Sequence, residues 1–319
     1  MNNSKLVKLA PLVVFAAAAM WGTVGMCTRY LYSIGFTPYQ ASMWRALVAG
    51  VIILPLMFIK NPGRMNLKSV KHLGYFVISG TFGLALCYSA YFLTIQASTL
   101  AVAAVMLYSS PIMVLIMARF IFKEKLTPKK IVSLIAAFAG CIIMSGILTG
   151  GAGALSFKGM IIGFLSGLGY ALYNIGSRLA LSKYDTFVVS AYTFLFTVLG
   201  MIPFTIGDST GPMMAEHPLS ILVVIIMGTF CTLIPYTIYV LALNYVEVGK
   251  ASVIAFAEPV VATFLGVIFY HEELTFTNII AILLILLSVL VVSVSFGKKK
   301  EAGSRELEAE SLELEDAEI

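Results

Sequence analysis

The sequence predicts an all-α integral membrane protein whose ten transmembrane helices form two inverted five-helix repeats. Three observations predict this fold class: the composition, a series of apolar segments of spanning length, and an internal repeat. The 319-residue chain is 60% hydrophobic and 12% charged, with a mean hydropathy of +0.96. In soluble domains about a quarter of the residues are charged. The composition therefore indicates a protein that crosses the lipid bilayer several times, and we expect no nucleic-acid partner.

Ten apolar segments are long enough to cross a bilayer, which requires about 20 mainly apolar residues in a helix. Breaks such as "KNPGRMN" and "KEKLTPKK" contain the proline, glycine and charged residues of turns. The segments lack the period-2 alternation of barrel strands. The first segment continues past Trp21, which makes it too long for a cleaved signal peptide. The expected spans are 11–34, 38–59, 73–95, 100–122, 129–148, 157–179, 187–206, 219–241, 251–270 and 277–296.

Lysine and arginine are concentrated in alternate loops, and this sets the expected orientation. Cytoplasmic loops of membrane proteins are rich in these two residues. If the amino terminus lies inside, the inner segments contain seventeen Lys and Arg residues and the outer loops contain only Lys158. We therefore expect a multi-pass protein of the cell (inner) membrane with both termini in the cytoplasm.

The chain contains an internal repeat at an offset of 148 residues. The tripeptide "GTF" begins at Gly80 and again at Gly228, and the same offset pairs Glu124 with Glu272. Because each repeat holds five spans, an odd number, the two halves should cross the membrane in opposite directions. Secondary transporters often have this plan, with the substrate bound near the midplane between the repeats. The expected divisions are a cytoplasmic amino terminus (1–10), a first repeat (11–148), an outer linker (149–156), a second repeat (157–296) and an acidic cytoplasmic tail (297–319).

A family resemblance is carried by the repeated segments "LYSSPIMVLIMARFIFKEKLT" and "AFAEPVVATFLGVIFYHEELT", together with Trp21–Gly22 and Arg45–Ala46. Over about residues 10–296, the chain resembles the ten-helix EamA-type branch of the drug/metabolite transporter superfamily. The resemblance implies a transporter of small metabolites, often outward, such as amino acids or toxic compounds. It also implies a central cavity that is lined by spans one to four and six to nine and flanked by Pro111 and Pro259.

The two prolines also mark candidate cavity positions on physical grounds. Proline removes a main-chain hydrogen bond and kinks a helix. Carbonyl groups freed in this way are tolerated at membrane depth only where they are buried in protein or meet water. We therefore expect Pro111 and Pro259 to kink their helices, and Ser109 and Ser110 to lie near the substrate.

Glu258 is an acidic residue within a predicted span, directly before Pro259. A carboxylate at membrane depth is costly unless it is paired, hydrated or protonated, and such acids usually face a transport pathway. One interpretation is a carboxylate that binds an amine or exchanges protons during transport. The other is a structural carboxyl that ties span nine to a neighbouring helix. Its equivalent in the first repeat is Ser110, so the halves differ at this point, as expected if one half carries the coupling chemistry.

Arg45, in span two, allows three interpretations: it holds a substrate carboxylate, pairs with Glu258, or extends towards the outer headgroups. Aromatic residues at matched positions in both halves suggest two walls of a cavity for aromatic or cationic solutes, or ordinary packing between helices. The expected substrate-binding residues are Trp21, Arg45, Tyr88, Tyr91, Ser109, Ser110, Tyr170, Asn174, Tyr236 and Glu258.

The leading functional prediction is a secondary-active exporter of a small metabolite, driven by protons or by the solute gradient. The solute would be an amino acid or an amphipathic or cationic compound. A lipid flippase and a facilitative channel are alternatives. We do not expect an enzyme, because the predicted spans contain one carboxylate and no histidine. We expect no cofactor or metal site either, since the four cysteines lie singly in apolar runs and the chain has no phosphate-binding loop motif.

Overall fold

The computed structural model describes residues 3–60, 67–97, 100–147, 157–205 and 210–294, and within these ranges it is helical without strands. The predicted outer linker and the acidic tail lie outside the described residues. The first half contains α1 (Asn3–Gly22), α2 (Val24–Ser33), α3 (Pro38–Lys60), η2 (Val70–His72), α4 (Leu73–Phe76), η3 (Val77–Ala85), α5 (Leu86–Ala97), α6 (Leu100–Leu107), α7 (Ser110–Ile121) and α8 (Pro128–Met144). The second half contains α9 (Phe157–Leu181), α10 (Thr186–Thr205), α11 (Thr210–Glu216), α12 (Leu219–Gly228), η5 (Thr229–Leu233), α13 (Ile234–Ala242), α14 (Val248–Ile254), α15 (Ala257–Tyr270) and α16 (Phe276–Val294).

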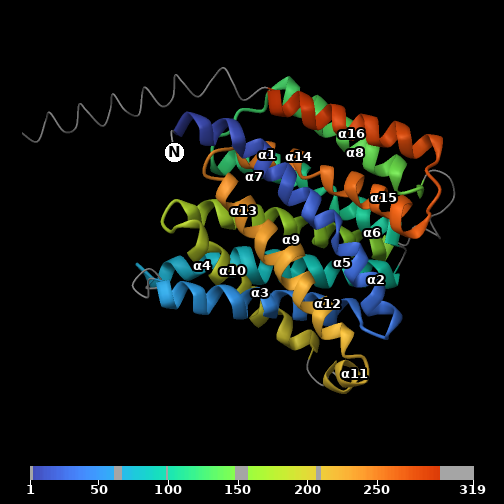
Figure 1. The fold of residues 1–319 in the computed structure, drawn as a ribbon. Coiled ribbons are helices and arrows are strands. Elements are labelled where there is room, and N and C mark those ends of the chain that lie inside the picture. Colours follow the sequence, from blue (N-terminus) through green and yellow to red (C-terminus); the bar gives the residue numbers. More distant parts are fainter. Residues whose placement is uncertain (1–2, 61–66, 98–99, 148–156, 206–209, 295–319) are drawn as a thin grey trace, which may run out of the picture.

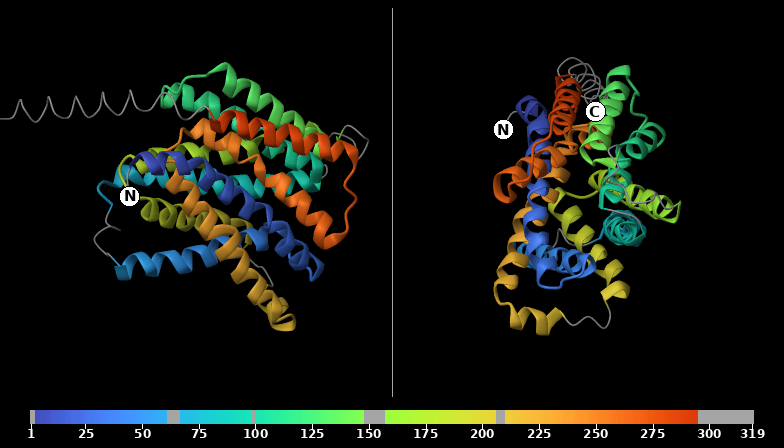
Figure 2. Two further views of the ribbon diagram at one scale, coloured as in Figure 1. Left: turned by 45° about the horizontal axis from the view of Figure 1, so that its top comes forward. Right: turned by 90° about the vertical axis from the view of Figure 1, so that its right-hand side faces the viewer.

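Nine segments of the described chain are long and apolar enough to cross a membrane. They correspond to nine of the ten predicted spans, and several are built from two or three consecutive helices. The remaining predicted span, 129–148, corresponds to α8, which has 17 residues. This helix packs along α16 at one edge of the bundle (Figure 1). Figure 2 shows α3 on the opposite edge, with α1, α9 and α13 between them.

Two spans are interrupted shortly before a proline. The helix ends at Leu107 and restarts at Ser110, one residue before Pro111. In the second half it ends at Ile254 and restarts at Ala257, two residues before Pro259. Proline has no amide hydrogen and clashes with the preceding turn, so it is tolerated where a helix begins. Each break therefore lies directly before one of the two prolines, and the expected kinks stay a prediction.

The segments that follow these two spans share an unusual backbone conformation. Lys123 and His271, which are 148 residues apart, have positive φ angles of 55° and 54°. Positive φ is uncommon for residues other than glycine. In both segments the next residue, Glu124 or Glu272, donates its amide hydrogen at 3.2 Å to the carbonyl six residues earlier. The sequence repeat is thus accompanied by the same local turn in each half.

Close contact between helices depends on small residues. A Cβ atom at Gly22 of α1 would lie 2.8 Å from the carbonyl oxygen of Glu258 and 2.9 Å from the Cβ of Val261. Real Cβ atoms do not approach other atoms so closely, so only glycine allows α1 to rest on α15 here. In α9, Gly163 and Gly167 face α6 in the same way. The glycine of α1 thus places that helix directly against the backbone of Glu258.

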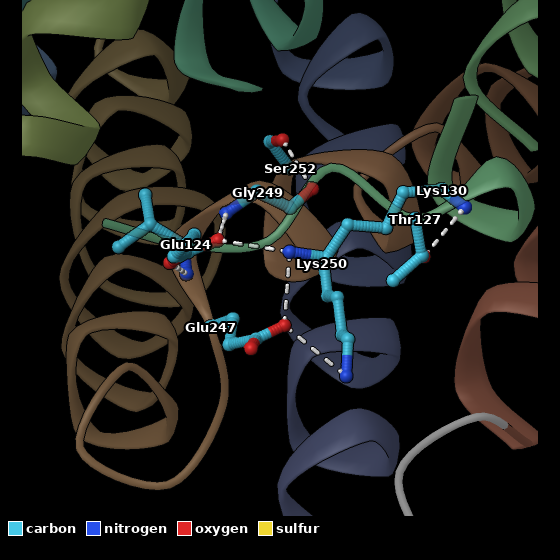
Figure 3. A network of polar contacts seen from close by, with 8 residues as sticks. Glu124, Thr127, Lys130, Glu247, Gly249, Lys250 and Ser252 are labelled. Carbon is cyan, nitrogen blue, oxygen red and sulfur yellow. Dashed lines mark hydrogen bonds and ion pairs between the residues drawn. The ribbon is translucent and has the colours of Figure 1, made fainter. Parts of the chain in front are cut away.

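Four charged residues form a cluster where α7 ends and α8 and α14 begin (Figure 3). The Nζ atom of Lys130 lies 3.2 Å from Glu124 Oε2 and 3.0 Å from Glu247 Oε2. The Nζ atom of Lys250 lies 3.1 Å from the same oxygen of Glu247. The Lys130 side chain is only 2% exposed. A buried ammonium group must be paired, and the two carboxylates meet that requirement.

We expect the stability that Glu247 contributes to be lost in acid. Burial raises the pKa of this carboxyl, but hydrogen bonds and charge attraction from Lys130 and Lys250 outweigh burial and hold the pKa below its ordinary value. A carboxyl of this kind stabilises the fold above its unfolded-state pKa, and the contribution disappears as the pH falls through the folded-state pKa. Because the side chain is 40% exposed, the effect should stay within about 1 kcal/mol.

The measurement is the melting temperature of the detergent-purified protein between about pH 7 and about pH 3, below the ordinary carboxyl range. Wild type should be more stable than Glu247→Gln at neutral pH, and the two curves should converge in acid. Other carboxyls titrate in both proteins, so only the difference between the curves reports on Glu247. A difference that stays constant over the whole range would contradict the prediction.

Candidate functional site

A cavity lies between the two interrupted spans and α9. Its walls come from the α6–α7 break, from α9 and from the α14–α15 break, so both halves contribute. The lining residues are Leu107, Tyr108, Ser110, Pro111, Tyr170, Ser252, Ala255, Phe256 and Glu258. Three of the residues expected to bind substrate, Ser110, Tyr170 and Glu258, therefore line one cavity, and the kink residue Pro111 lies beside them.

Glu258 supplies the acidic group of this cavity. It lies in the first turn of α15, and its side chain is partly exposed, whereas Pro259 next to it is buried. A carboxylate in the first turn is favoured by the helix dipole. Within the described residues, no hydrogen bond or ion pair involves the carboxylate of Glu258. The contact to a neighbouring helix that the structural interpretation requires is therefore missing from the described part of the chain.

Arg45 interacts with two tyrosines rather than with an acid. Its Nη2 atom donates to the hydroxyl oxygen of Tyr88 at 2.5 Å and lies 3.4 Å from that of Tyr236. The guanidinium carbon lies 4.3 Å from the centre of the Tyr88 ring. Among the described residues no ion pair joins Arg45 to Glu258. Arg45 therefore has no anionic partner among the described residues, and a substrate carboxylate as its partner stays a prediction.

Tyr88 and Tyr236, at matched positions of the two halves, contact each other instead of forming opposite walls of a cavity. The hydroxyl groups of Tyr88 and Tyr236 are 2.8 Å apart. Trp21 packs against this pair, with its ring centre 4.8 Å from that of Tyr236, and its buried Nε1–H has no hydrogen-bond partner among the described residues. Trp21 also contacts Tyr170 edge-on at 6.4 Å between ring centres. Trp21 thus lies between Tyr236, which contacts Arg45, and Tyr170 of the cavity wall.

Three expected residues have local roles or lie apart from the cavity. Asn174 is fully buried: its Nδ2 donates to the carbonyl of Tyr170 at 2.8 Å, and its Oδ1 accepts from the hydroxyl of Tyr239. The hydroxyl of Ser109 donates to the carbonyl of Met106 at 2.6 Å. Tyr91 lies one helical turn after Tyr88 in α5 and is partly exposed. None of the three is among the lining residues of the cavity.

Two aromatic residues of the cavity wall, Tyr108 and Phe256, were missed by the sequence analysis. Their ring centres lie 5.9 Å apart, and each occupies the two-residue gap between the paired helices of its span. A signal for them was present, because they are 148 residues apart and so occupy equivalent positions in the repeat.

Apolar helices of spanning length, broken at two prolines around a cavity that contains a carboxylate, form the arrangement of a membrane transporter. Comparison with known proteins agrees. The chain belongs to the EamA-like transporter family, whose model matches residues 8–146 and again residues 157–294. The family predicted from the repeated segments is therefore confirmed.

Individual relatives support the same class. The chain is 23% identical to an "uncharacterized transporter" of Clostridium kluyveri, with 89% of this chain and 93% of that protein aligned. It is 24% identical to the "uncharacterized inner membrane transporter YicL" of Salmonella typhimurium, with 91% and 97% aligned. A solved crystal structure is similar with a TM-score of 0.76 and 19% identity over 89% of this chain and 96% of that chain. At this identity the structural likeness shows the fold alone.

Proposed function

We propose that the protein is a secondary-active exporter that carries a small metabolite with a protonated amine by alternating access. The single observation that carries this proposal is the carboxylate of Glu258, which lines the cavity and has no partner in the described chain. An unpaired carboxylate at membrane depth favours a cation, either a proton or an ammonium group. If both compete for this one group, outward movement of the solute is coupled to inward movement of protons. Export as the direction rests on the family resemblance.

A second charged group suggests that the solute is zwitterionic. Arg45 contacts neutral tyrosine hydroxyls, and its buried Nε–H has no hydrogen-bond partner among the described residues. Guanidinium groups bind carboxylates through two parallel hydrogen bonds. The aromatic rings of Trp21 and Tyr170 lie between the two charged regions. An amino acid with an aromatic or apolar side chain offers an ammonium group for Glu258, a carboxylate for Arg45 and a hydrophobic body for the rings.

The proposal includes ten spans in two inverted halves, with both termini in the cytoplasm of the cell. The 148-residue repeat, the shared turn at Lys123 and His271, and the two family matches support the repeated architecture. The distribution of lysine and arginine supports the orientation. Inverted repeats allow one half to rock against the other around a central site. That movement is the expected mechanism of transport.

The test is uptake of labelled phenylalanine, phenylethylamine and phenylpropionate into proteoliposomes that contain the purified protein. These probes share one ring and differ in which charged groups they carry. We expect saturable transport of phenylalanine and phenylethylamine, accelerated by an opposing proton gradient, and none of phenylpropionate. Transport of phenylpropionate as fast as that of phenylethylamine would contradict an amine-binding Glu258. Non-saturable flux would favour a channel, and movement of a labelled phospholipid without any solute transport would favour a flippase.

A further inference from the structure

Glu124 fastens the end of the first half to the second half. Its Oε1 accepts the amide hydrogen of Val248 at 2.9 Å, and its Oε2 accepts that of Gly249 at 3.3 Å. These amides begin α14 and have no acceptor within the helix itself. The carboxylate thus replaces two missing hydrogen bonds, and its negative charge suits the start of a helix. The helix held in this way leads directly into the α14–α15 break that lines the cavity.

Lys130 strengthens the same contact from the opposite side. Its buried ammonium group lies between Glu124 of the first half and Glu247 of the second, at 3.2 Å and 3.0 Å. The four charged residues of Figure 3 therefore lie across the boundary between the halves. A buried charge loses its hydration, so separating the halves here requires water to replace both partners of the lysine. In the proposed orientation this is the cytoplasmic end of the cavity.

The position of Gly249 shows how tightly the contact is built. A Cβ atom at this residue would lie 3.1 Å from Glu124 Oε2 and 3.3 Å from the Cγ of Leu115. Contacts this short force the neighbouring atoms to move. Glycine at the second position of α14 therefore lets the carboxylate approach the helix closely. A substitution there offers a way to weaken the contact without removing a charge.

The equivalent carboxylate of the second half makes a different contact. Glu272 has the same turn conformation as Glu124, but its Oε1 lies 2.6 Å from Nη2 of Arg29, and both side chains are about half exposed. The repeat offset places Leu100 and Ala101, the first residues of α6, where Val248 and Gly249 stand in the other half. Among the described residues, Glu124 holds a helix of the opposite half and Glu272 does not.

We propose that Glu124 and Glu272 are positioning residues that act in turn during transport. Glu124, with Lys130, holds the inner end closed in the state seen here. In the opposite state Glu124 releases α14, and Glu272 leaves Arg29 to bind the start of α6. This proposal rests on the proposed alternating-access function, but it makes no assumption about the solute.

The test is the accessibility of the cavity from each side of the membrane. In a variant whose native cysteines are replaced, Ala255→Cys places one thiol in the cavity wall. A membrane-impermeant maleimide is applied to right-side-out and to inverted vesicles. Glu124→Gln should increase labelling from the cytoplasmic side about fivefold or more, as expected when one of two states loses about 1 kcal/mol. Adding Glu272→Gln should lower this labelling again, because the opposite state then loses its own contact.

Two further variants serve as a control and as a second test of the same contact. Glu216→Gln makes the same chemical change at an exposed residue of α11 and should leave the labelling unchanged. If Glu124→Gln does not fold, Gly249→Ala tests the same contact and should also increase labelling from the cytoplasmic side. Unchanged labelling in a folded Glu124→Gln or Gly249→Ala variant would overturn the proposal, as would an equal increase in Glu216→Gln. Because labelling requires no solute, a wrong solute class would leave this result unaffected.

Discussion

Glu258→Gln should remain folded and lose amine transport together with its pH dependence. The glutamine has nearly the same shape but cannot exchange a proton or balance a cation. Hydrogen bonds to charged groups contribute about 1.5–3 kcal/mol, so binding of phenylethylamine should weaken about ten- to a hundredfold. The wild-type rate should depend on pH, whereas any residual rate of the variant should not. Proteoliposome uptake at several pH values measures both effects.

The folded state of this variant is checked independently. The carboxylate of Glu258 makes no hydrogen bond or ion pair with another described residue, so its replacement should change the melting temperature little in the absence of ligand. Glu258→Asp keeps the charge on a shorter side chain and should retain pH dependence with weaker binding. Glu216→Gln serves as the matched control on the surface. Full, pH-dependent transport by a folded Glu258→Gln variant would reduce this carboxyl to a structural group.

Much of the helical architecture could be predicted because long apolar segments in a membrane have few alternatives to the helix. The positions at which the helices are interrupted were harder to predict. The break at Pro111 follows from the chemistry of proline, but the π-helical segments η3 and η5 contain no proline. In the structure η3 packs against α10, and η5 packs against α3.

The sequence allowed the polar residues of the candidate site to be predicted, but not the contacts that these residues make with one another. Glu258 was found because a carboxylate is conspicuous in an apolar span. The partners of Arg45 could not be chosen from the sequence, since helical periodicity gives the face of a helix but not its neighbour. The structure brings Tyr88 and Tyr236, at equivalent positions of the two halves, into contact with the same arginine. Tyr108 and Phe256, which are also 148 residues apart, contact each other in the same way.

The second large expected effect is a loss of thermal stability in Gly80→Ala, at a close contact between η3 and α10. Gly80 lies in η3, and a Cβ atom there would be 2.6 Å from both the Cβ of Phe196 and the carbonyl oxygen of Thr193. The amide nitrogen of Thr197 would be 2.9 Å away. All three atoms belong to the backbone or the Cβ positions of α10, so a rotamer change cannot relieve the contact. Either η3 or α10 must move, and overpacking of this kind typically costs about 1–3 kcal/mol.

Gly50→Ala provides the matched control, because it adds the same methyl group to a glycine of α3 that has no atom within 4 Å of the new Cβ. Alanine is favoured over glycine in helices by about 1 kcal/mol, so this variant should be as stable as wild type or slightly more so. Thermal unfolding in detergent, followed by tryptophan fluorescence, compares the three proteins directly. Equal melting temperatures for Gly80→Ala and Gly50→Ala would show that η3 and α10 are packed less closely than the structure indicates. A large loss confined to Gly80→Ala would establish that the helix beside the arginine-bound tyrosines is held by direct backbone contact.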